Sequence, residues 1–578
     1  MASRNGPVHV VTTRRGYKGK LYETHLLRRT YREDGKVKNE TVGNLSHLPR
    51  EVIELVRRAL RGEKFAPASE LFEVTASRIH GDTHAVLTAM QRLGFRALLS
   101  SRPCREADLV MGMVAARVVA PHTKLATTRW WPTRTLAEDL GIERADEDDL
   151  YRAMDWLVGR QGAIEKKLGA RHLRSGSLAL YDLTSSYFEG TRCPLAKMGH
   201  DRDGTKNKLQ VNYGLLTDRR GCPVAVSVYA GNTNDPKTLM PQVHKLRESF
   251  GLKRVVMVGD RGMIGQTTVE QLRDVEGLFW ITALKSGQIR TLVQGGTLQL
   301  GLFDERNLFE LTHADYPGER LVACRNPELG RLRAHKRKAL LEATTQELDK
   351  VRARVARGAL RGAGKIGVRV GRVVNKYKVA KHFDLVIEDR RFDFRIVEQE
   401  VAAEAALDGI YVIRTSLPKK QMSGAEAVRS YKALTEVERA FRTMKTVDLK
   451  VRPIHHRLAE RVRAHIFLCM LAYYVEWHMR EAWRALLFAD EDLEAKAKRD
   501  PVAPARRSAE AEQKAATHTL EDGTPAHSFR TLLEELSTIV RNTCRAPGAA
   551  GDAPTFRVAT TPSQKQRQAL QMLEAIAA

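Results

Sequence analysis

The middle of the chain alternates apolar strands with short helices, and this succession restricts the fold more than any other feature. Strands are expected at 178–190, 208–218, 222–231, 254–260 and 278–285. A helix with Asp235 as N-cap and Pro236 at its first position follows the third strand, and another at 266–275 follows the fourth. The first three strands should form an antiparallel meander, and strands one, four and five can lie side by side in one mixed sheet. The expected fold class is α/β.

Two carboxylates interrupt or end these apolar strands. Asp182 lies within the first strand, in LALYDL, and Asp260 ends the fourth, VVMVGD. An apolar strand rarely buries a charge without a reason. In the expected strand order the two side chains meet at one edge of the sheet, where they repel each other unless a cation lies between them. A hard divalent ion such as Mg²⁺ suits these oxygen ligands, although Asp260 taken alone also fits a helix cap.

A third carboxylate is expected from the helical segment YKALTEVERAFRTMK, residues 431–445, which contains Glu436 and Glu438. Seven residues advance a helix by about 700°, close to two full turns. Tyr431, Glu438 and Lys445 therefore share one stripe, and Glu436 points away from it. An aromatic ring, a carboxylate and an ammonium in line suit a metal beside a phosphodiester. The alternative is an ordinary salt-bridged helix face.

The charge balance indicates the kind of partner. The chain has 578 residues, with 96 Lys and Arg against 69 Asp and Glu, a formal charge of +27. Such an excess predicts a polyanion, either nucleic acid or an anionic membrane surface. The longest apolar run, 466–475, has ten residues, about half of what a bilayer-spanning helix needs. The N-terminus has no signal-peptide pattern, and we expect a cytoplasmic protein.

About half of the positive excess lies in one tract. Residues 331–381 contain 16 Lys and Arg against 3 Asp and Glu. From 336 to 360 the apolar residues keep helical spacing, which predicts a helix with a charged face. That face is either a nucleic-acid contact or simply solvated. The sequence around the tract has the apolar alternation of strands, so residues 301–420 are expected to form a β-rich insertion.

The cysteines and glycines argue against other kinds of site. The six cysteines are scattered and contain no C-x-x-C pair, which predicts reduced thiols, with neither a disulfide framework nor a structural zinc. The segment 358–366 lacks the first glycine of a phosphate-binding loop and has Ile366 where Ser or Thr should bind magnesium. The glycines of 259–265 are not spaced as in a dinucleotide-binding turn.

These patterns divide the chain into successive regions. We expect a small basic β-hairpin module at 1–62, with a turn at 33–36 and a helix from Arg50, and then a helical domain at 63–170, suited to DNA binding. The remaining regions are the first part of the core at 171–300, the insertion at 301–420, C-terminal core helices at 421–488, a linker at 489–527, and a helical tail at 528–578 whose helix covers 528–542.

The constellation resembles the DDE transposases of bacterial insertion sequences, in the group named after insertion sequence four. Its signature helix reads Y-x2-R-x3-E-x6-K, which Tyr431, Glu438 and Lys445 match in type and spacing. Leu434 stands at the Arg position, and Arg442, one turn beyond Glu438, is a candidate substitute. The resemblance covers roughly residues 10–480.

The resemblance implies an RNase H-like core and a specific chemistry. Asp182, Asp260 and Glu438 would be the catalytic residues and would bind two Mg²⁺ ions, with Mn²⁺ as a substitute. Tyr431, Lys445 and Arg442 would contact DNA. The partners would be the terminal inverted repeats of the transposon and the target DNA, bound by a homodimer, and the protein would be associated with the bacterial nucleoid.

Further cations close in sequence to the acidic residues are candidates to line a DNA path. They are Lys206, Lys208, Arg452, His455, His456, Arg461 and Arg463. The two histidines fit equally well as ordinary helix-end residues. Two alternatives to a transposase stay open: an RNase H-like nuclease or resolvase that cuts without strand transfer, and a DNA-binding regulator that keeps only the scaffold.

Overall fold

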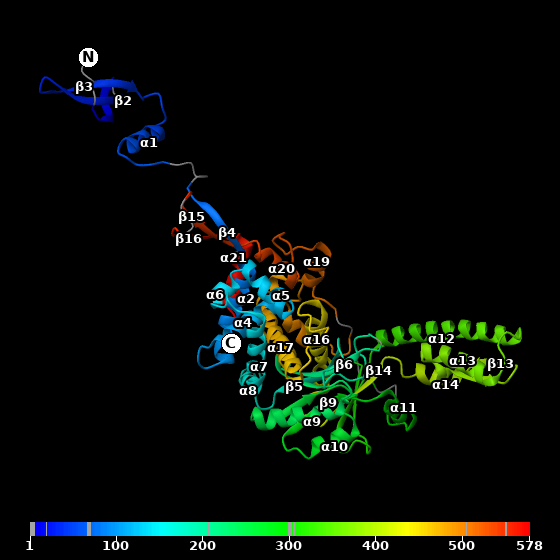
Figure 1. The fold of residues 1–578 in the computed structure, drawn as a ribbon. Coiled ribbons are helices and arrows are strands. Elements are labelled where there is room, and N and C mark those ends of the chain that lie inside the picture. Colours follow the sequence, from blue (N-terminus) through cyan, green and yellow to red (C-terminus); the bar gives the residue numbers. More distant parts are fainter. Residues whose placement is uncertain are drawn as a thin grey trace. The chain divides into compact units, whose positions relative to one another are not determined.

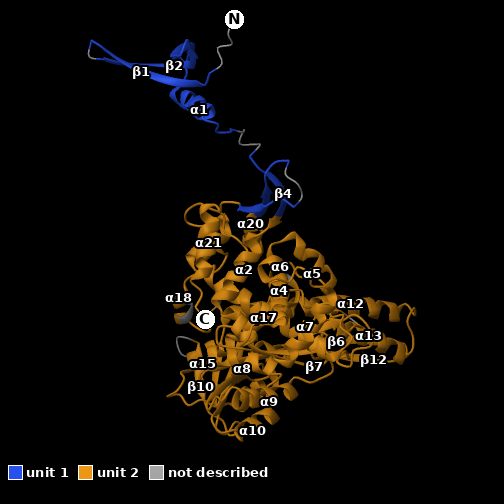
Figure 2. Cartoon of the chain, turned by 60° about the vertical axis from the view of Figure 1, so that its left-hand side comes forward, with its two compact units in different colours: residues 1–77, 541–559 blue, residues 78–540, 560–578 orange. Residues whose placement is uncertain are grey.

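The computed structural model describes residues 6–18, 20–65, 71–205, 207–298, 303, 307–503, 506–548 and 552–577 (Figure 1). The chain divides into two compact units. Unit 1 comprises residues 1–77 and 541–559, and unit 2 comprises residues 78–540 and 560–578 (Figure 2).

Unit 1 contains strands of two small sheets and a helix. The first sheet pairs β1 (Val8–Tyr17), β2 (Lys20–Glu33) and β3 (Lys36–Asn44), and α1 (Arg50–Leu60) follows. The expected turn is confirmed, because Asp34 and Gly35 have φ values of 52° and 76° between β2 and β3, as a two-residue hairpin loop requires. The module is three-stranded, because β1 also pairs with β2 in antiparallel fashion. The second sheet has the order β16 (Thr555–Ala559), β15 (Val540–Arg545), β4 (Glu73–Ile79).

A helical region opens unit 2, as expected for most of residues 63–170, but Glu73–Ile79 differ from the expectation because they form strand β4, which pairs with β15. Its helices are α2 (Gly81–Arg92), α3 (Phe95–Leu99), α4 (Arg105–Val119), α5 (Lys124–Trp130), α6 (Leu136–Leu140), α7 (Glu147–Gly159) and α8 (Gln161–His172). Helix α17 (Ala459–Ala482) contacts α2, α4 and α7 of this region, as well as strand β7 (Pro223–Ala230) of the main sheet. Because α17 lies between these helices and the main sheet, it is buried over most of its length and has no polar face. The apolar run 466–475 is therefore a core helix.

The core sheet has the predicted order. Its first five strands are β5 (Leu178–Phe188), β6 (Leu209–Thr217), β7, β8 (Val255–Val258) and β9 (Leu278–Ala283), with α9 (Pro236–His244) and α10 (Gln266–Arg273) in the crossovers. Strands β5, β6 and β7 are antiparallel, whereas β8 is parallel to both β5 and β9. Within the described residues the sheet has eight strands in the order β10-β11-β14-β9-β8-β5-β6-β7. The mixed sheet is that of an RNase H-like core.

The segment 301–420 contributes strands, as expected, but its longest elements are helices. Strands β10 (Leu308–Leu311), β11 (Arg320–Arg325) and β14 (Ile410–Thr415) extend the core sheet. Between β11 and β14 lie α12 (Pro327–Ala356), α13 (Ala363–Tyr377), the hairpin of β12 (Phe383–Ile387) and β13 (Phe392–Ile396), and α14 (Glu398–Ala405). Figure 1 shows α12 and α13 side by side in green.

The basic tract thus forms a helical hairpin with a core of its own. The expected helix at 336–360 begins earlier, because the Asn326 side chain accepts a hydrogen bond from the backbone N–H of Leu329 and caps the helix at Pro327. The second helix, α13, was not expected. Its Ile366 and Val370 pack against Leu348 and Val351 of α12, so the helix is stabilised by a partner that periodicity within one segment does not reveal.

The expected linker at 489–527 is wrong as a description, because much of it is ordered. It contains α18 (Leu493–Lys498) and α19 (Ala509–Thr517), and Val502, Ala511 and Leu520 are buried. Lys514 is buried as well, with Nζ 3.2 Å from the carbonyl oxygen of Ala485. Alanine faces and a buried lysine stem give no apolar periodicity, so the sequence pattern missed them.

The C-terminal region also differs from the expected helical tail. The helix expected over 528–542 is α20 (Phe529–Leu536), which ends early because residues from Val540 enter strand β15. Strand β16 follows, and only α21 (Gln564–Glu574) continues the helical pattern. Pairing with strands from both ends of the chain explains why local propensity was overridden.

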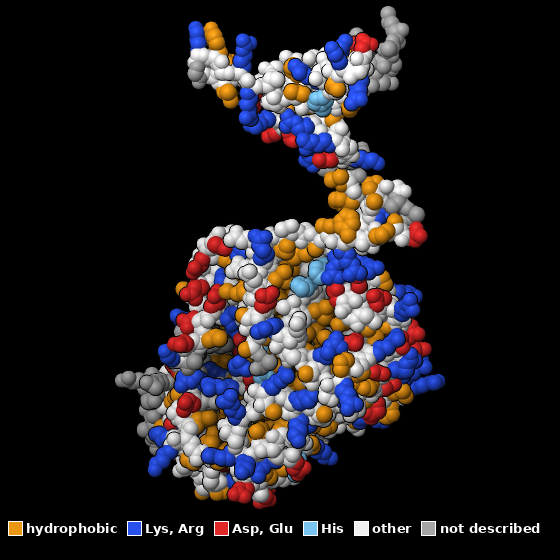
Figure 3. Space-filling model, turned by 90° about the vertical axis from the view of Figure 1, so that its left-hand side faces the viewer, with side chains coloured by type: hydrophobic (Ala, Val, Ile, Leu, Met, Phe, Trp, Pro, Cys, Tyr) orange, Lys and Arg blue, Asp and Glu red, His pale blue; other side chains and the backbone are white. Residues whose placement is uncertain are grey.

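The surface carries charges of both signs. On the face drawn in Figure 3, Lys and Arg side chains are spread among Asp and Glu. No helix among the described residues is both long enough and apolar enough to cross a membrane.

A buried ion pair fastens the extension of the sheet and gives a stability test. Arg414 Nε donates to Glu319 Oε2 at 2.6 Å, and both side chains are almost fully buried. We expect Arg414→Ala to lower the free energy of unfolding by about 3–5 kcal/mol, because it leaves a buried carboxylate short of its partner. Urea denaturation measures the change.

The matched control is Arg395→Ala, which removes an exposed pair with Asp384 at 2.8 Å and should cost less than about 1 kcal/mol. Equal costs for the two variants would contradict the view that burial makes the Arg414 pair important.

Candidate active site

The register between β5 and β8 brings Asp182 and Asp260 to neighbouring strand positions. The parallel ladder pairs Leu178 with Val256 and Leu180 with Val258, and each pair is 78 residues apart in the chain. Asp182 and Asp260 are separated by the same 78 residues, two positions beyond the last pair. The sheet therefore places both carboxylates at one edge, as the sequence predicted.

Asp182 lies in a setting that disfavours its charge. Burial is the main cause that raises the pKa of Asp182 to about 6, and the negative charges of Asp260 and Glu438 contribute to this rise. The backbone N–H of Leu183, which donates to Asp182 Oδ1 at 2.8 Å, and the cation of Arg202 act in the opposite direction. The charges of both other carboxylates thus act on the pKa of Asp182, so the three acidic groups belong to one electrostatic cluster.

Asp260 is held in the exposed loop after β8. Its Oδ2 accepts a hydrogen bond from the backbone N–H of Gly262 at 3.2 Å, and its Oδ1 accepts one from the hydroxyl of Tyr431 at 3.2 Å. The pKa of the Tyr431 phenol is raised mainly by burial and, to a smaller extent, by the charge of Asp260. The phenol therefore keeps its proton and serves as a donor to the carboxylate.

Glu438 comes from a helix that packs on β5, but this helix is shorter than expected. The segment 431–445 is divided between α15 (Gly424–Lys432), α16 (Leu434–Arg442) and a π-helical turn, Thr443–Val447. In α16 the buried residues include Val437 and Ala440, and Glu438 is exposed. The break between α15 and α16 does not separate the expected residues, because Tyr431 still contacts Asp260 and the charge of Glu438 still acts on Asp182.

Glu436 has a different environment, as the helix register predicts. Its carboxylate forms an ion pair with Arg439 at 2.7 Å. Its Cβ packs against Gly221 in the β6–β7 turn, where a methyl group on Gly221 would come within 2.8 Å of it. Gly221 has a φ of 84°, so this turn combines a left-handed backbone with close packing, and only glycine satisfies both. Glu436 is therefore a packing residue on the turn.

Lys445 is the residue that departs most from the expected arrangement. Its Nζ lies 2.9 Å from Asp203 Oδ1, and Lys445 is buried. Arg452 also pairs with Asp203, whose Oδ2 accepts the backbone N–H of Tyr187 at 3.1 Å. Burial alone would raise the pKa of Asp203, but Arg452 and Lys445 outweigh it and lower the pKa. Lys445 therefore fastens the loop between β5 and β6.

Asp203 was not among the sequence candidates. It lies in the loop sequence DRDG, which has no apolar strand around it to mark the carboxylate as unusual. The neighbouring Arg202 pairs with Asp235 at 2.6 Å and is the cation sensed by Asp182. A cation is thus present beside the acidic cluster, and it comes from a loop that strand and helix patterns do not position.

Most other cations nominated for a DNA path are already engaged. The ion pairs are Lys208 with Glu189, Arg452 with Asp203, Arg461 with Asp155 and Arg463 with Glu460. Arg442 is exposed. Burial, followed by nearby cations, lowers the pKa of His456 to about 3, so His456 is a neutral interior residue. Lys206 lies outside the described residues.

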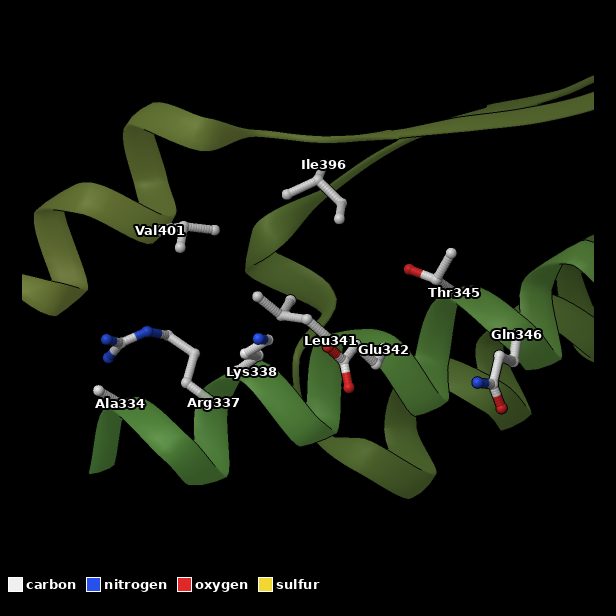
Figure 4. Close-up of a pocket in the computed structure, with 9 residues that line it drawn as sticks. All are labelled: Ala334, Arg337, Lys338, Leu341, Glu342, Thr345, Gln346, Ile396 and Val401. Atoms are coloured by element: carbon white, nitrogen blue, oxygen red, sulfur yellow. The ribbon is translucent and has the colours of Figure 1, made fainter. Parts of the chain in front are cut away.

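A cavity of about 570 Å³ lies elsewhere in unit 2 and is lined by residues of α12, β13 and α14 (Figure 4). Its polar lining includes Arg337, whose guanidinium is bound to Asp408. None of the three clustered carboxylates lines this cavity.

The mixed core sheet is that of the RNase H-like class of proteins. The family described as "Transposase DDE domain" matches residues 175–475, and "IS1634 family transposase, N-terminal domain" matches residues 10–70. The chain belongs to the DDE transposase family. It is therefore a DNA-cleaving and strand-transferring enzyme of an insertion sequence that depends on divalent metal.

Other comparisons are more remote. No curated protein matches the chain. Among solved structures, the chain is similar to a cryo-EM structure of the piggyBac transposase synaptic complex with hairpin DNA. The sequence identity is 8%, the TM-score is 0.30, and the match covers 79% of this chain and 70% of that one.

The raised pKa of Asp182 gives a pH test of the cluster. The ordinary value is 3.8 and the folded value is about 6. The folded protein therefore keeps a proton that the unfolded chain loses, so metal-free protein loses stability as the pH rises between these values. Asp182→Asn should remove the loss and raise the free energy of unfolding at pH 8 by at most about 3 kcal/mol, with little effect at pH 4.

Urea denaturation in a chelator at the two pH values measures the effect, and the exposed Asp274→Asn serves as the control. A stabilisation by Asp182→Asn that is equal at both pH values would contradict the assignment. Adding Mg²⁺ at pH 8 should stabilise the wild type more than the Asn variant.

Proposed function

We propose that Asp182, Asp260 and Glu438 are the catalytic carboxylates and hold two Mg²⁺ ions, for which Mn²⁺ can substitute. The observation that carries the proposal is the combination of the β5–β8 register with the electrostatic coupling of Asp182 to the other two. The donor set fits, because all three ligands offer carboxylate oxygens, which Mg²⁺ prefers. Their mutual repulsion is relieved by divalent cations.

The chemistry follows from this ligand set. When bound, the two ions supply activation of the attacking water or 3′-OH and stabilisation of the leaving oxygen. The protein residues supply position. The Tyr431 hydroxyl orients Asp260 through its hydrogen bond, and Asp182 is held within a strand of the core sheet. Glu438 is exposed on α16, so its carboxylate is accessible to metal ions and DNA that bind from solvent.

The DNA contacts near the scissile bond are proposed for Tyr431 and Arg442, both of which lie on the α15–α16 segment. Lys445 was expected to join them, but its pairing with Asp203 gives it a positioning role in the loop between β5 and β6. The match of Tyr431, Glu438 and Lys445 to Y-x2-R-x3-E-x6-K supports placement in the group named after insertion sequence four.

We propose that the substrates are the two terminal inverted repeats of the element and the target DNA. Because an element has two ends, two copies of the chain would act in one synaptic complex as a homodimer. A protein of this kind works on chromosomal DNA, which supports its association with the nucleoid in the bacterial cytoplasm.

A cleavage assay with Mg²⁺ and the terminal repeats tests the site. Alanine at Asp182, Asp260 or Glu438 should abolish cleavage and leave binding to the ends intact, because metal ligands are lost without loss of the DNA surface. Glu436→Ala is the matched control: it keeps the Cβ that packs on Gly221 and removes the carboxylate that pairs with the exposed Arg439, a surface pair that contributes little. It should keep activity.

The products also separate the alternatives. Cleavage with joined products indicates a transposase, cleavage alone a nuclease or resolvase, and binding alone a regulator. An inactive Glu436→Ala beside an active Glu438→Ala would show that the third carboxylate is misassigned.

A stripe of four cations on α13 is the strongest candidate for a DNA surface remote from the carboxylates. Lys365, Arg369, Arg372 and Lys376 recur at helical spacing and are exposed, and the opposite face of α13 packs on α12. The ion pairs found among the described residues involve none of these four. In unit 1, residues 1–62 carry 14 Lys and Arg against 6 Asp and Glu, which supports a second contact.

The salt dependence of DNA binding tests the stripe. Each phosphate contact contributes about 0.9 to the slope of log K against log salt. Changing all four residues to Ala should therefore reduce the slope by about 3 to 4. The control exchanges Lys and Arg at the same positions, which keeps every charge and should keep the slope. An unchanged slope in the Ala variant would exclude the stripe from the DNA contact.

A further inference from the structure

Three side chains far apart in the sequence meet on the side of the sheet that faces α17. His172 is the last residue of α8, Cys222 precedes β7, and His478 lies in α17. Within the described part of the chain, they are the one group of His, Cys, Asp and Glu side chains whose ligand atoms all lie within 4.8 Å of one another. This group is separate from the DDE carboxylates.

The geometry is close to that of a bound zinc ion. Cys222 Sγ lies 3.9 Å from His172 Nε2 and 3.8 Å from His478 Nε2. Tetrahedral zinc with ordinary bond lengths separates sulfur and nitrogen ligands by about 3.6 Å. Movements of a few tenths of an ångström would bring the sulfur to this distance from each nitrogen, and the two nitrogens, which lie within 4.8 Å of each other, would close to about 3.3 Å around the metal. These distances are also long for hydrogen bonds to a thiol, so the Cys222 side chain is only weakly hydrogen-bonded to the two histidines.

The surroundings keep the three groups in place and the imidazoles neutral. Cys222 and His478 are buried, and His172 is half-buried. Burial, followed by the neighbouring His172, lowers the pKa of His478 to about 3, so the ring nitrogen is free of a second proton at neutral pH. The hydroxyl of Tyr474 lies 3.1 Å from His172 Nε2, which puts a further oxygen at the cluster.

A buried carboxylate lies in the second layer. Asp218 Oδ1 accepts the backbone N–H of Cys222 at 2.9 Å, and its charge acts on both His172 and the Cys222 thiol. This negative charge would partly offset the net positive charge of zinc bound to one thiolate and two neutral imidazoles. Metal sites generally depend on such outer partners.

We propose that His172, Cys222 and His478 bind one zinc ion, with water or the Tyr474 oxygen in the fourth position. On binding, the Cys222 thiol gives its proton to solvent and the thiolate sulfur coordinates the metal. The absence of a C-x-x-C pair argued against structural zinc in the sequence. A C-x-x-C pair is not needed here, because each ligand comes from a different part of the fold.

The position of the site indicates a structural role. Zinc would join α8 and α17 to the β6–β7 turn, which ends at Cys222. The preceding residue, Gly221, packs against Glu436 of the helix that also carries Glu438. The metal would thus stabilise the β6–β7 turn, on which the helix that carries Glu438 packs, without touching the reacting atoms. Its presence does not depend on the proposed catalytic mechanism.

Metal analysis of the full-length protein tests the proposal. Protein purified without chelator and dialysed against Mg²⁺ should retain about one equivalent of zinc. Replacement by Co²⁺ should produce the visible bands of tetrahedral cobalt and a thiolate-to-cobalt charge-transfer band. A zinc-free wild type that shows neither band after loading with Co²⁺ would overturn the proposal, and this result does not depend on any variant folding.

Variants then assign the ligands. Cys222→Ser and His478→Gln should lose the zinc and the charge-transfer band. Cys469→Ser removes another buried thiol and should keep both. Asp182→Asn should also keep the zinc, which distinguishes this site from metal bound at the catalytic carboxylates. Retention of zinc and of the charge-transfer band by Cys222→Ser would exclude the site.

Discussion

The parallel pairing of β5 with β8 is the constraint on which the rest of this structure depends. Strand β8 is short, and its ladder to β5 is set by the residues Val256 to Val258. A slip of one residue would turn Asp182 and Asp260 to opposite faces. The apolar faces of both strands are buried in the core, so hydrophobic packing specifies the register, and the register in turn specifies the carboxylate pair.

In the folded, metal-free protein, the carboxylates of such a metal site repel one another. Asp182 is buried beside two other acids, and its pKa is raised accordingly. The surrounding ion pairs hold the loops that carry and support the cluster. Asp203, with Lys445 and Arg452, fastens the loop between β5 and β6. The carboxylates themselves stay available for cations, and the Tyr431 hydroxyl orients Asp260 without neutralising it.

Much of the core and its carboxylates could be predicted from the sequence, because strand periodicity is local and a charge within an apolar strand stands out. The helix register that favours Glu438 over Glu436 is also a local property. Other features depend on partners remote in sequence. Helix α13 is stabilised by packing on α12, and strand β15 by pairing within its sheet. The role of Lys445 is determined by its ion pair with Asp203. The His172–Cys222–His478 cluster likewise exists only after folding.

The most direct test is the position of bound metal. Crystals of the full-length protein with a terminal-repeat duplex, soaked in Mn²⁺, locate the ions by anomalous scattering. We expect two manganese peaks between Asp182, Asp260 and Glu438, next to the scissile phosphate and about 3.5–4 Å apart. Peaks bound by other residues, with these three carboxylates too far apart to share an ion, would contradict this expectation.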